Sequence, residues 1–368
     1  MSAAMRLSRW HTGLTATNPS VAALVVRDGA IVGAAVTAPG GRPHAETQAL
    51  SMAGGKARGA TLYVTLEPCS HHGKTPPCAD AITAAGISRV VVSLTDPDPR
   101  VSGRGLAILR DAGIAVESGV LEEEGRRVLG AYLMRQTRGR PQVTLKLAVS
   151  ADGMIGRRDH APGEGQVAIT GPVARAQVHV LRAEMDAILV GIGTALADDP
   201  ELTCRAPGLE ARSPLRIVLD RRLDLPPASK LVRSARDVPV IAASIGEAFE
   251  TPETPETREP PGSGRAARRR ALADAGVEIL ETGSLATLLS SLAARGVSSL
   301  LVEGGAGVAR SFLDQGLVDR ILLFEGTTTV GASGLASPLT RADMPAGFRL
   351  LREEAFGPDR LTEYERFS

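Results

Sequence analysis

The chain has 368 residues and a mass of 38.3 kDa, which is more than one hydrophobic core usually serves, so we expect two domains. Its 42 Lys and Arg residues nearly balance its 41 Asp and Glu residues, and only 3% of its residues are aromatic. Nucleic acid binding relies on excess positive charge and on stacking surfaces, so this composition argues against a nucleic acid and favours small-molecule partners.

The N-terminal segment and the cysteines indicate the cellular compartment of the protein. Residues 1–14 carry Arg6, Arg9 and His11 among apolar residues, so we expect an ordinary helix and not a signal peptide. No run of eighteen apolar residues occurs, and we expect no membrane partner. Three cysteines, an odd number, favour metal or catalytic roles in a reducing compartment, so we expect a cytoplasmic protein.

The first part of the chain alternates predicted strands and helices. Two apolar runs over residues 21–36 flank Asp28 and Gly29, which indicates a β-hairpin. Pro43 then opens a predicted helix that ends at two glycines. The next elements are strands at 61–66, 89–94 and 114–119 and helices at 78–86 and 103–113. This alternation predicts a layered α/β sheet.

A polar stretch at residues 137–141 predicts the boundary between a domain of residues 1–140 and a domain of residues 141–368. The second domain is predicted to be another α/β unit, with strands at 143–149, 187–190, 215–220, 238–243, 277–280, 298–302 and 321–324. Residues 246–264 are rich in Pro, Glu and Thr with few groups to bury, which favours a mobile surface loop.

Potential metal ligands lie at three predicted element ends in the first domain. His44 begins a helix, Cys69 follows a strand, and Cys78 begins the next helix. An imidazole and two thiolates suit Zn²⁺, whose catalytic sites keep three protein ligands and leave the fourth position to water. Glu46, two residues after His44, does not share its helix face, so we expect it to carry protons and not to bind the metal.

The alternative for these residues is a closed structural zinc site with His71 or His72 as the fourth ligand. Such sites seldom need a carboxylate beside their His ligand. Taken singly, the two histidines are also expected to pack in a loop or face solvent. Cys204 has no Cys or His neighbour in the sequence and is expected to pack as a small hydrophobic residue.

The pattern HAE at residues 44–46, followed by Pro68-Cys69 and a later Cys78, resembles the signature of zinc nucleobase deaminases, in which a non-ligating Glu is the acid and base. Eight residues separate the two cysteines, where most members of that group have two. With NPSVAALVVRDGAIVG upstream and TDPDPRVSGRG downstream, the chain is similar to the pyrimidine deaminases of riboflavin biosynthesis.

This resemblance implies a cytidine-deaminase-like three-layer fold and a set of site residues. Glu46 would carry the proton, and Asn18, Lys74 and Asp96 would contact the substrate, with Lys74 meeting its phosphate. The sequence departs from the family pattern at Thr17, Ala23 and Asp98. The change at Asp98 puts one substrate hydrogen bond in doubt, whereas the other two are expected to alter only loop shape.

Two glycine-rich turns follow predicted strands in the second domain. Gly191, Gly193 and Thr194 follow one strand, and the turn at residues 304–307 follows another and opens a helix whose N–H groups could hold a phosphate. Either turn alone fits a tight strand-to-helix connection without a ligand equally well.

Together with LKLAVSADG, AITGPVAR and LRAEMDAILVGIGTALADDPELTCR, these turns resemble the reductase domain that is usually fused to such deaminases. The resemblance implies a dihydrofolate-reductase-like α/β fold and NADPH as the hydride donor. The positions that match cofactor contacts are Ala148, Thr194, Asp198, Gly305 and Gly307. Those that match contacts to a ribose phosphate are Arg182, Leu202, Arg205 and Glu303.

Lys146 matches a lysine near the reacting sugar, although a solvated lysine at a strand end is the alternative. Arg221 and Arg222 could meet the 2′-phosphate of NADPH or could be solvated loop residues. Two departures from the reductase pattern are Ala168, where the family usually has Trp, and Gln166, where a small polar residue often contacts substrate.

The resemblance therefore implies a bifunctional enzyme that deaminates a diaminopyrimidinone ribosyl phosphate and then reduces the ribosyl group to ribityl. One alternative, suggested by Ala168, is a deaminase whose second domain binds nucleotide only to regulate. Another is that the first domain deaminates tRNA or free cytidine, against which the balanced charge and the long insertion weigh. We also expect a homo-oligomer.

Overall fold

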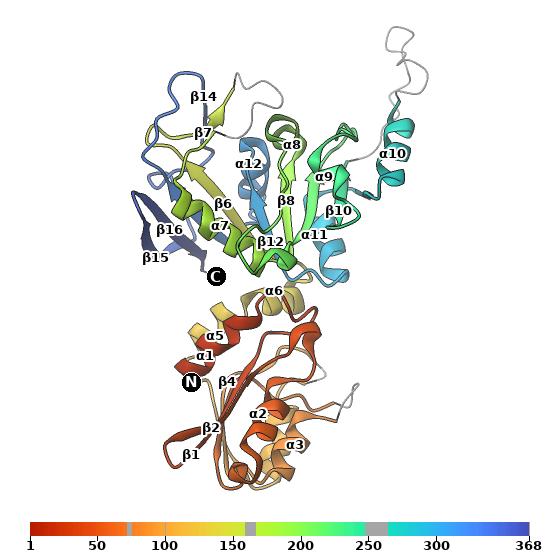
Figure 1. Cartoon of the computed structure of the whole chain (residues 1–368). Coiled ribbons are helices and arrows are strands. Elements are labelled where there is room, and N and C mark those ends of the chain that lie inside the picture. The colour runs from red at the N-terminus through yellow and green to blue at the C-terminus, as the bar shows by residue number, and fades with distance from the viewer. Residues whose placement is uncertain (72–75, 100, 159–166, 247–263, 368) are drawn as a thin grey trace. The chain divides into compact units, whose positions relative to one another are not determined.

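The computed structural model describes residues 1–71, 76–99, 101–158, 167–246 and 264–367 (Figure 1). The chain divides into two compact units: Met1–Pro141 with Gly296–Ser298 form unit 1, and Gln142–Arg295 with Ser299–Ser368 form unit 2. Apart from its two end residues, the expected loop at 246–264 lies outside the described residues. Every helix in the described ranges is too short or too polar to traverse a bilayer.

Unit 1 is built on a five-stranded sheet with the order β2-β1-β3-β4-β5. β1 pairs antiparallel with β2 and β3, whereas β3, β4 and β5 run parallel. The strands are β1 (Ala22–Arg27), β2 (Ala30–Val36), β3 (Thr61–Leu66), β4 (Arg89–Leu94) and β5 (Ala115–Ser118). Asp28 and Gly29 have φ angles of 49° and 77°, the left-handed pair that a two-residue hairpin needs, and the predicted hairpin is confirmed.

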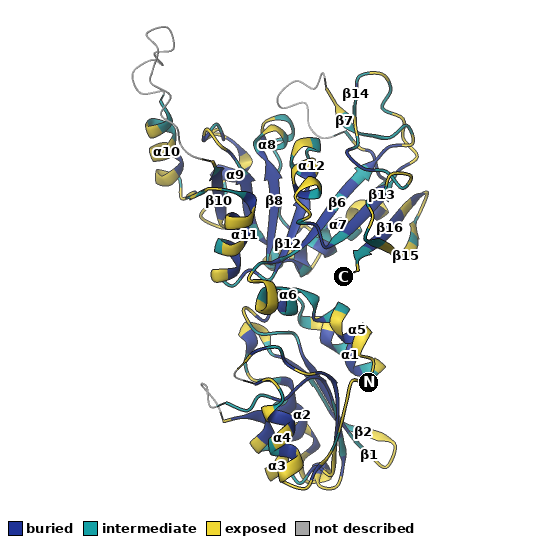
Figure 2. Cartoon of the chain, turned by 180° about the vertical axis from the view of Figure 1, so that it is seen from behind, coloured by how far each residue is buried: buried dark blue, intermediate teal, exposed yellow. Residues whose placement is uncertain are grey.

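Helices cover both faces of this sheet, as the buried strands in Figure 2 show. Successive strand residues face opposite sides, so Ala23 and Val25 pack with one helix layer while Ala22 and Leu24 pack with α1. The helices are α1 (Ser2–Ser8), α2 (Ala45–Ala53), α3 (Cys78–Ala84), α4 (Arg104–Asp111), α5 (Glu122–Val128) and α6 (Gly130–Arg138). The helix expected over residues 1–14 is shorter, because the chain tightens into a 3₁₀ turn at Arg9–His11.

Unit 2 contains a nine-stranded sheet with the order β11-β10-β9-β8-β12-β6-β13-β16-β15. The first seven of these are parallel, and β13, β16 and β15 pair antiparallel. Their bounds are β6 (Gln142–Val149), β8 (Ala187–Gly191), β9 (Leu215–Leu219), β10 (Val240–Ile245), β11 (Glu278–Thr282), β12 (Ser299–Glu303), β13 (Arg320–Glu325), β15 (Phe348–Phe356) and β16 (Asp359–Arg366). All seven strands predicted for this part of the chain are present.

Helices also lie on both faces of the larger sheet. Figure 1 shows α7 (Pro172–Glu184) in front of it, and Figure 2, which views the molecule from behind, shows α11 (Leu285–Ala294) and α12 (Ala306–Asp314) in front of the other face. The helix α8 (Ile192–Asp198) follows the carboxyl end of β8 directly. The remaining helices are α9 (Lys230–Arg233) and α10 (Arg265–Asp274), and a separate two-stranded sheet pairs β7 (Met154–Arg157) with β14 (Gly334–Ala336).

The sequence analysis did not anticipate β15 and β16. β15 is the edge strand and carries charged side chains at Arg349, Arg352, Glu353 and Glu354. Such a composition lacks the apolar alternation by which strands are recognised. Its register is fixed across the pair, where Arg352 Nε donates to the buried Glu363 of β16 at 2.6 Å.

Candidate active sites

Three side chains of unit 1 converge as a metal site requires. His44 is the N-cap of α2, Cys69 follows β3, and Cys78 is the first residue of α3. His44 Nδ1 lies 3.7 Å from Cys69 Sγ and 3.4 Å from Cys78 Sγ, and the three ligand atoms all lie within 4.8 Å of one another. One imidazole nitrogen and two sulfurs form a donor set that Zn²⁺ prefers, so these residues fit the metal.

The pKa values of the two cysteine thiols are shifted in opposite directions. A hydrogen bond from the Cys78 thiol lowers the pKa of Cys69 to about 4, and the Cys78 backbone N–H adds a bond to Cys69 Sγ at 3.3 Å. The same contact raises the pKa of Cys78, and the hydrogen bond to Cys69 raises the pKa of His44. The cluster thus concentrates negative charge on sulfur, as a cation site should.

Glu46 lies in the first turn of α2 and is only 3% exposed. Burial raises its pKa, which the neighbouring His44 partly offsets. Glu46, His44 and Cys69 line one cavity of about 650 Å³. A buried carboxyl group with a raised pKa, beside a metal site, is suited to exchange protons near neutral pH.

The same cavity is lined by Asn18, Asp96, Asp98 and Tyr132. Tyr132 Oη donates to Asp96 Oδ1 at 2.9 Å, and the Asp98 backbone N–H donates to the same oxygen at 2.9 Å. Burial raises the pKa of Asp96, while these two donors oppose the rise. The sequence analysis missed Tyr132, because one aromatic residue on the buried face of α6 cannot be told from an ordinary core residue.

The other residues singled out in unit 1 divide into two groups. Lys74 and His72 lie outside the described residues. His71 lines the cavity, but the metal-ligand cluster found among the described residues consists of His44, Cys69 and Cys78. Thr17 lines the cavity too, and Ala23 is fully buried in β1.

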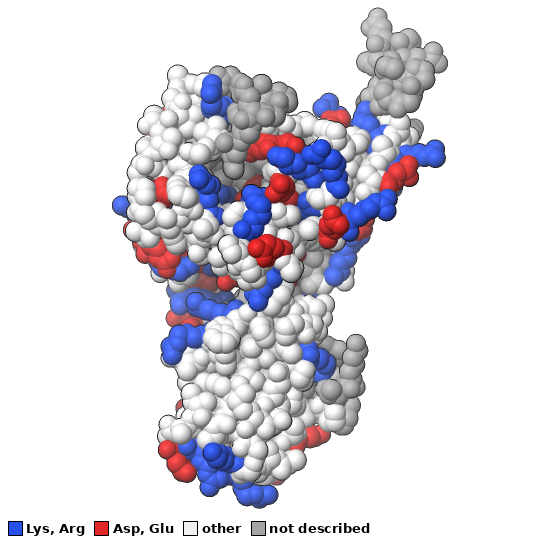
Figure 3. Space-filling view, viewed as in Figure 1, with Lys and Arg blue, Asp and Glu red and all other residues white. Residues whose placement is uncertain are grey.

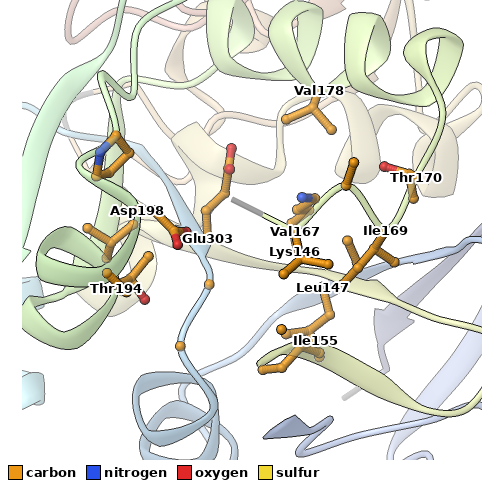
Figure 4. Close-up of a pocket in the computed structure, with 18 of the residues that line it drawn as sticks. Lys146, Leu147, Ile155, Val167, Ile169, Thr170, Val178, Thr194, Asp198 and Glu303 are labelled. Atoms are coloured by element: carbon orange, nitrogen blue, oxygen red, sulfur yellow. The ribbon is translucent and has the colours of Figure 1, made fainter. Parts of the chain in front are cut away.

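Unit 2 has a cavity of about 820 Å³ next to the carboxyl ends of β6, β8 and β12 (Figure 4). Ligands of parallel sheets usually bind at this edge. The cavity collects most of the predicted reductase residues: Lys146, Ala148, Arg182, Thr194, Asp198, Leu202, Arg205, Glu303 and Gly305. Gly307 lies in α12 and is not among its lining residues, and Gln166 lies outside the described residues.

A buried ion pair joins Arg182 of α7 to Glu303 at the end of β12. Arg182 Nε and Nη2 donate to the two Glu303 oxygens at 2.9 and 2.8 Å, and Nη1 donates to the Thr203 carbonyl at 3.2 Å. Burial disfavours the Glu303 carboxylate, but Arg182 and Lys146 outweigh it and hold the pKa of Glu303 at about 2. Arg182 therefore faces the cavity with three of its five N–H donors already engaged.

Lys146 lies beside this pair because β6 and β12 run in register, with Lys146 opposite Glu303. Burial lowers the pKa of Lys146, and Glu303 partly opposes the decrease. Its Nζ lies 5.8 Å from the centre of the Phe324 ring. A half-buried ammonium group of lowered pKa is able to donate a proton within the cavity.

The segment of residues 199–205, of which Pro200, Leu202 and Arg205 line the cavity, is held by several contacts. Leu202 is buried with φ at 55°, a conformation that an L-residue adopts only when its surroundings impose it. The fully buried Arg216 donates to the Glu201 carbonyl at 3.0 Å, and the Arg205 backbone N–H donates to His179 Nδ1 at 3.2 Å. The sequence analysis missed His179, which lines the cavity and whose pKa burial lowers.

The remaining residues singled out in unit 2 lie as follows. Ala168 lines the cavity, whereas Arg222 pairs with Asp224 at 2.8 Å and neither Arg221 nor Arg222 is among the lining residues. Cys204 is buried and donates to the His179 carbonyl at 3.2 Å, so it packs inside as expected. Three lining arginines were not anticipated: Arg157, Arg158 and Arg175.

Comparisons with known proteins cover both units. Residues 1–94 match the cytidine and deoxycytidylate deaminase zinc-binding region, and residues 141–362 match the RibD C-terminal domain. The riboflavin biosynthesis protein RibD of Aquifex aeolicus is 40% identical over 90% of this chain and 87% of its own length. RibD of Escherichia coli is 39% identical over 90% of this chain and 88% of its own length.

Solved structures agree with these matches. Acinetobacter baumannii RibD superimposes with a TM-score of 0.83 at 33% identity and covers 100% of this chain and 98% of its own. The diaminohydroxyphosphoribosylaminopyrimidine deaminase/5-amino-6-(5-phosphoribosylamino)uracil reductase of Thermotoga maritima gives a TM-score of 0.81 at 35% identity, covering 100% of this chain and 97% of its own. The expected pairing of a cytidine-deaminase-like domain with a reductase domain is confirmed, and the chain belongs to the RibD family of riboflavin biosynthesis proteins.

Proposed function

We propose that residues 1–140 deaminate the diaminopyrimidinone ribosyl phosphate of riboflavin biosynthesis and that residues 141–368 reduce the ribosyl group of the product to ribityl. The family is one of bifunctional deaminase–reductases that use Zn²⁺ and NADPH, and the chain shares both of its domains. The observation that carries the deaminase assignment is the convergence of His44, Cys69 and Cys78 beside the buried Glu46.

In the deaminase, His44 Nδ1 and the sulfurs of Cys69 and Cys78 would hold zinc, which lowers the pKa of a coordinated water. Glu46 would take a proton from the attacking water and deliver it to the amino group that leaves as ammonia. The raised pKa of Glu46 supports this role, because the carboxyl group must both accept and release a proton.

Substrate recognition in this cavity would rest on Asn18 and Asp96, with Lys74 meeting the phosphate. Asn18 is packed closely against the backbone, since a Cβ added at Gly41 would lie 2.2 Å from Asn18 Nδ2. Asp96 is held by the Tyr132 hydroxyl. Both side chains are thus fixed before substrate arrives, which lowers the cost of ordering them on binding.

In the reductase, NADPH supplies the hydride, and the protein's task is to bind and orient both ligands. Ala148, Thr194, Asp198 and the turn at Gly305 and Gly307 would contact the cofactor. The substrate would lie against Arg182, Leu202, Arg205 and Glu303, since these residues gather in the same cavity. Lys146 would deliver a proton to the oxygen of the opening ribose, and its burial beside Glu303 supports this role.

Replacement of Glu46 by Gln tests the deaminase assignment. The variant should retain zinc, because the three ligands are untouched, and should lose about 10²- to 10⁴-fold in deamination, the usual contribution of a proton carrier. NADPH oxidation with the deaminated substrate provides an internal control, because it depends on residues of unit 2. Normal ammonia release by a zinc-loaded Glu46→Gln variant would refute the role.

Assays with different substrates distinguish the proposed function from two alternatives. If the second domain only regulated, the protein would not oxidise NADPH in sustained turnover when the deaminated ribosyl phosphate is added. If the first domain acted on cytidine or tRNA, ammonia release from those compounds would equal or exceed release from the diaminopyrimidinone. We expect sustained NADPH oxidation and a strong preference for the diaminopyrimidinone.

Self-association is a further part of the proposal. The face of unit 1 seen in Figure 3, over β2 and α2, carries few charged side chains. Ile31 of β2 and Met52 of α2 are 57% and 66% exposed, and Met52 Sδ lies 3.4 Å from the Ala34 backbone nitrogen of β2. Exposed apolar side chains on such a face favour a protein interface. Light scattering should therefore give a mass above 38.3 kDa.

A cytoplasmic location is proposed on the chemistry of the cysteines. All three are unpaired, and two of them form the metal cluster. A reducing compartment keeps such thiols available for zinc. Fractionation of the producing cells should recover both activities with the cytoplasmic fraction.

A further inference from the structure

Glu67 is a buried carboxylate of unit 1 that the proposed reaction does not use. Glu67 is the first residue after β3 and is 3% exposed. Oε2 accepts hydrogen bonds from the backbone nitrogens of Asp96 at 3.1 Å and Gly103 at 2.9 Å. Oε1 accepts from the backbone nitrogens of Gly105 at 2.9 Å and Leu106 at 3.4 Å. One carboxylate thus satisfies four N–H groups that are far away in the sequence.

These bonds close a loop. Oε2 holds both ends of the segment from Asp96 to Gly103, and Oε1 holds the first turn of α4, which begins directly after Gly103. The first N–H groups of a helix have no partner within the helix, and its positive end favours a carboxylate. Both ends of this segment and the first turn of α4 are therefore held by the carboxylate of Glu67.

The backbone around Glu67 is itself held in place by neighbouring segments. The Glu67 N–H donates to the Leu94 carbonyl at 2.8 Å, which extends the pairing of β3 with β4. A Cβ at Gly105 would lie 2.0 Å from the Pro68 carbonyl oxygen, so the start of α4 is in direct contact with the segment that leads to Cys69. We call the four hydrogen bonds accepted by Glu67 the clamp. The clamp residue and the metal ligand Cys69 lie in one short stretch, Glu67-Pro68-Cys69.

We propose that Glu67 is a positioning residue of the deaminase, which holds Asp96 and Asp98 at a fixed distance from the metal ligand Cys69. The inference rests on the proposed function, because it gives Asp96 a substrate contact. Both aspartates line the cavity, and Asp96 Oδ1 accepts from the Asp98 N–H, so displacing the loop displaces both side chains together.

A direct role for Glu67 in proton transfer is the competing interpretation, since Glu67 also lines the cavity. Its two oxygens, however, already accept four backbone N–H groups, and each proton taken up would break at least one of those bonds. Glu46, in contrast, lies in the first turn of α2, next to the metal ligand His44 at its N-cap. The two interpretations predict different kinetics.

The test is Glu67→Gln in the full-length zinc enzyme, with deamination, reduction and zinc content measured on the same preparation. The amide keeps one acceptor but turns an NH₂ group toward two N–H donors, so half of the clamp is lost. We expect the KM for the diaminopyrimidinone to rise more than kcat falls, with kcat/KM reduced by about 10- to 100-fold. Zinc content and NADPH-dependent reduction should stay unchanged.

Amide hydrogen exchange supplies a readout that is independent of substrate. The N–H groups of Asp96, Gly103, Gly105 and Leu106 should exchange roughly tenfold faster or more in Glu67→Gln, because they lose a charged acceptor. The matched control is Glu117→Gln on β5, whose carboxylate is 51% exposed and paired with Arg89. It should alter neither the kinetics nor the exchange of those four amides.

Unchanged kinetics and exchange in Glu67→Gln would overturn the proposal, and so would loss of zinc. Loss of kcat with unchanged KM and unchanged exchange would favour proton transfer and overturn it as well. If the wild-type enzyme released no ammonia from the diaminopyrimidinone, the proposed function would fail, while the exchange data would still decide whether the clamp exists. Should Glu67→Gln not fold, Glu67→Asp, which keeps the charge on a shorter side chain, must show the same changes to a smaller extent.

Discussion

Removing the charge of Glu303 should destabilise unit 2 far more than removing a charge at its surface. In Glu303→Gln, the amide retains one acceptor for Arg182 and presents an NH₂ group to the other N–H donor. The Arg182 and Glu303 side chains are only 12% and 9% exposed, so water compensates poorly for the lost partner. Breaking such a buried pair from one side costs about 3–5 kcal/mol in the free energy of unfolding.

For a domain of this size, that cost corresponds to a decrease of about 10 °C in the melting temperature of unit 2. Thermal unfolding followed by circular dichroism and calorimetry measures it. The matched control is Glu201→Gln, because Glu201 forms a pair with Arg205 whose side chains are 46% and 52% exposed. Exposed pairs contribute about 0–1 kcal/mol, so this control should melt within about 2 °C of the wild type. Equal melting temperatures for the two variants would refute the reasoning.

The other predictions concern pH, metal and packing. The pKa of Glu303 in the folded protein is about 2, below its ordinary value of 4.5. The ionised carboxylate therefore stabilises the folded protein fully above pH 4.5, and this stabilisation is lost as the pH falls toward 2. The unfolding free energies of wild type and Glu303→Gln, measured against pH, should converge over that window. Cys78→Ser should abolish zinc binding and deamination while NADPH-dependent reduction persists, and a zinc content equal to wild type by elemental analysis would contradict the ligand assignment. Tyr132→Phe removes a hydrogen bond to Asp96 and should raise the KM for deamination by about fivefold, corresponding to about 1 kcal/mol; an unchanged KM would show that Asp96 needs no such support. Gly326→Ala should cost about 1–3 kcal/mol of stability, because the new Cβ would lie 2.0 Å from the Ile169 carbonyl oxygen in the reductase cavity wall, whereas Gly283→Ala, with no atom within 4 Å of the new Cβ, should melt like the wild type.

Site residues could be predicted from the sequence where they lie close together in the chain and belong to residue types with a distinctive chemistry. His44, Cys69 and Cys78 lie at the ends of the consecutive elements α2, β3 and α3. Imidazole and thiolate groups together are typical zinc ligands, so their convergence could be expected from the element ends alone. Glu303 and Arg182 were both assigned to substrate, but their pairing could not be foreseen, because they lie 121 positions apart and only the tertiary contact between α7 and the end of β12 brings them together.

Other features carry no local signal. Tyr132 and His179 each stand on a helix face where an aromatic residue usually packs in a core, and only the three-dimensional arrangement shows that they face a cavity. Glu67 was passed over for a similar reason, since its four partners lie 29 to 39 residues further along the chain. The early end of α1 at Ser8 reflects a choice between α and 3₁₀ hydrogen bonding, which differ too little in energy for composition to decide.

The charged edge strand β15 has a consequence for how the protein behaves in a crowded cell. An uncovered strand offers unpaired backbone groups to any other extended chain, which is how amyloid-like stacking begins. A foreign strand docking on β15 would have to strip water from the charged groups of Arg349, Arg352, Glu353 and Glu354. The charged groups of β15 therefore disfavour the pairing of a further strand with this edge of the nine-stranded sheet.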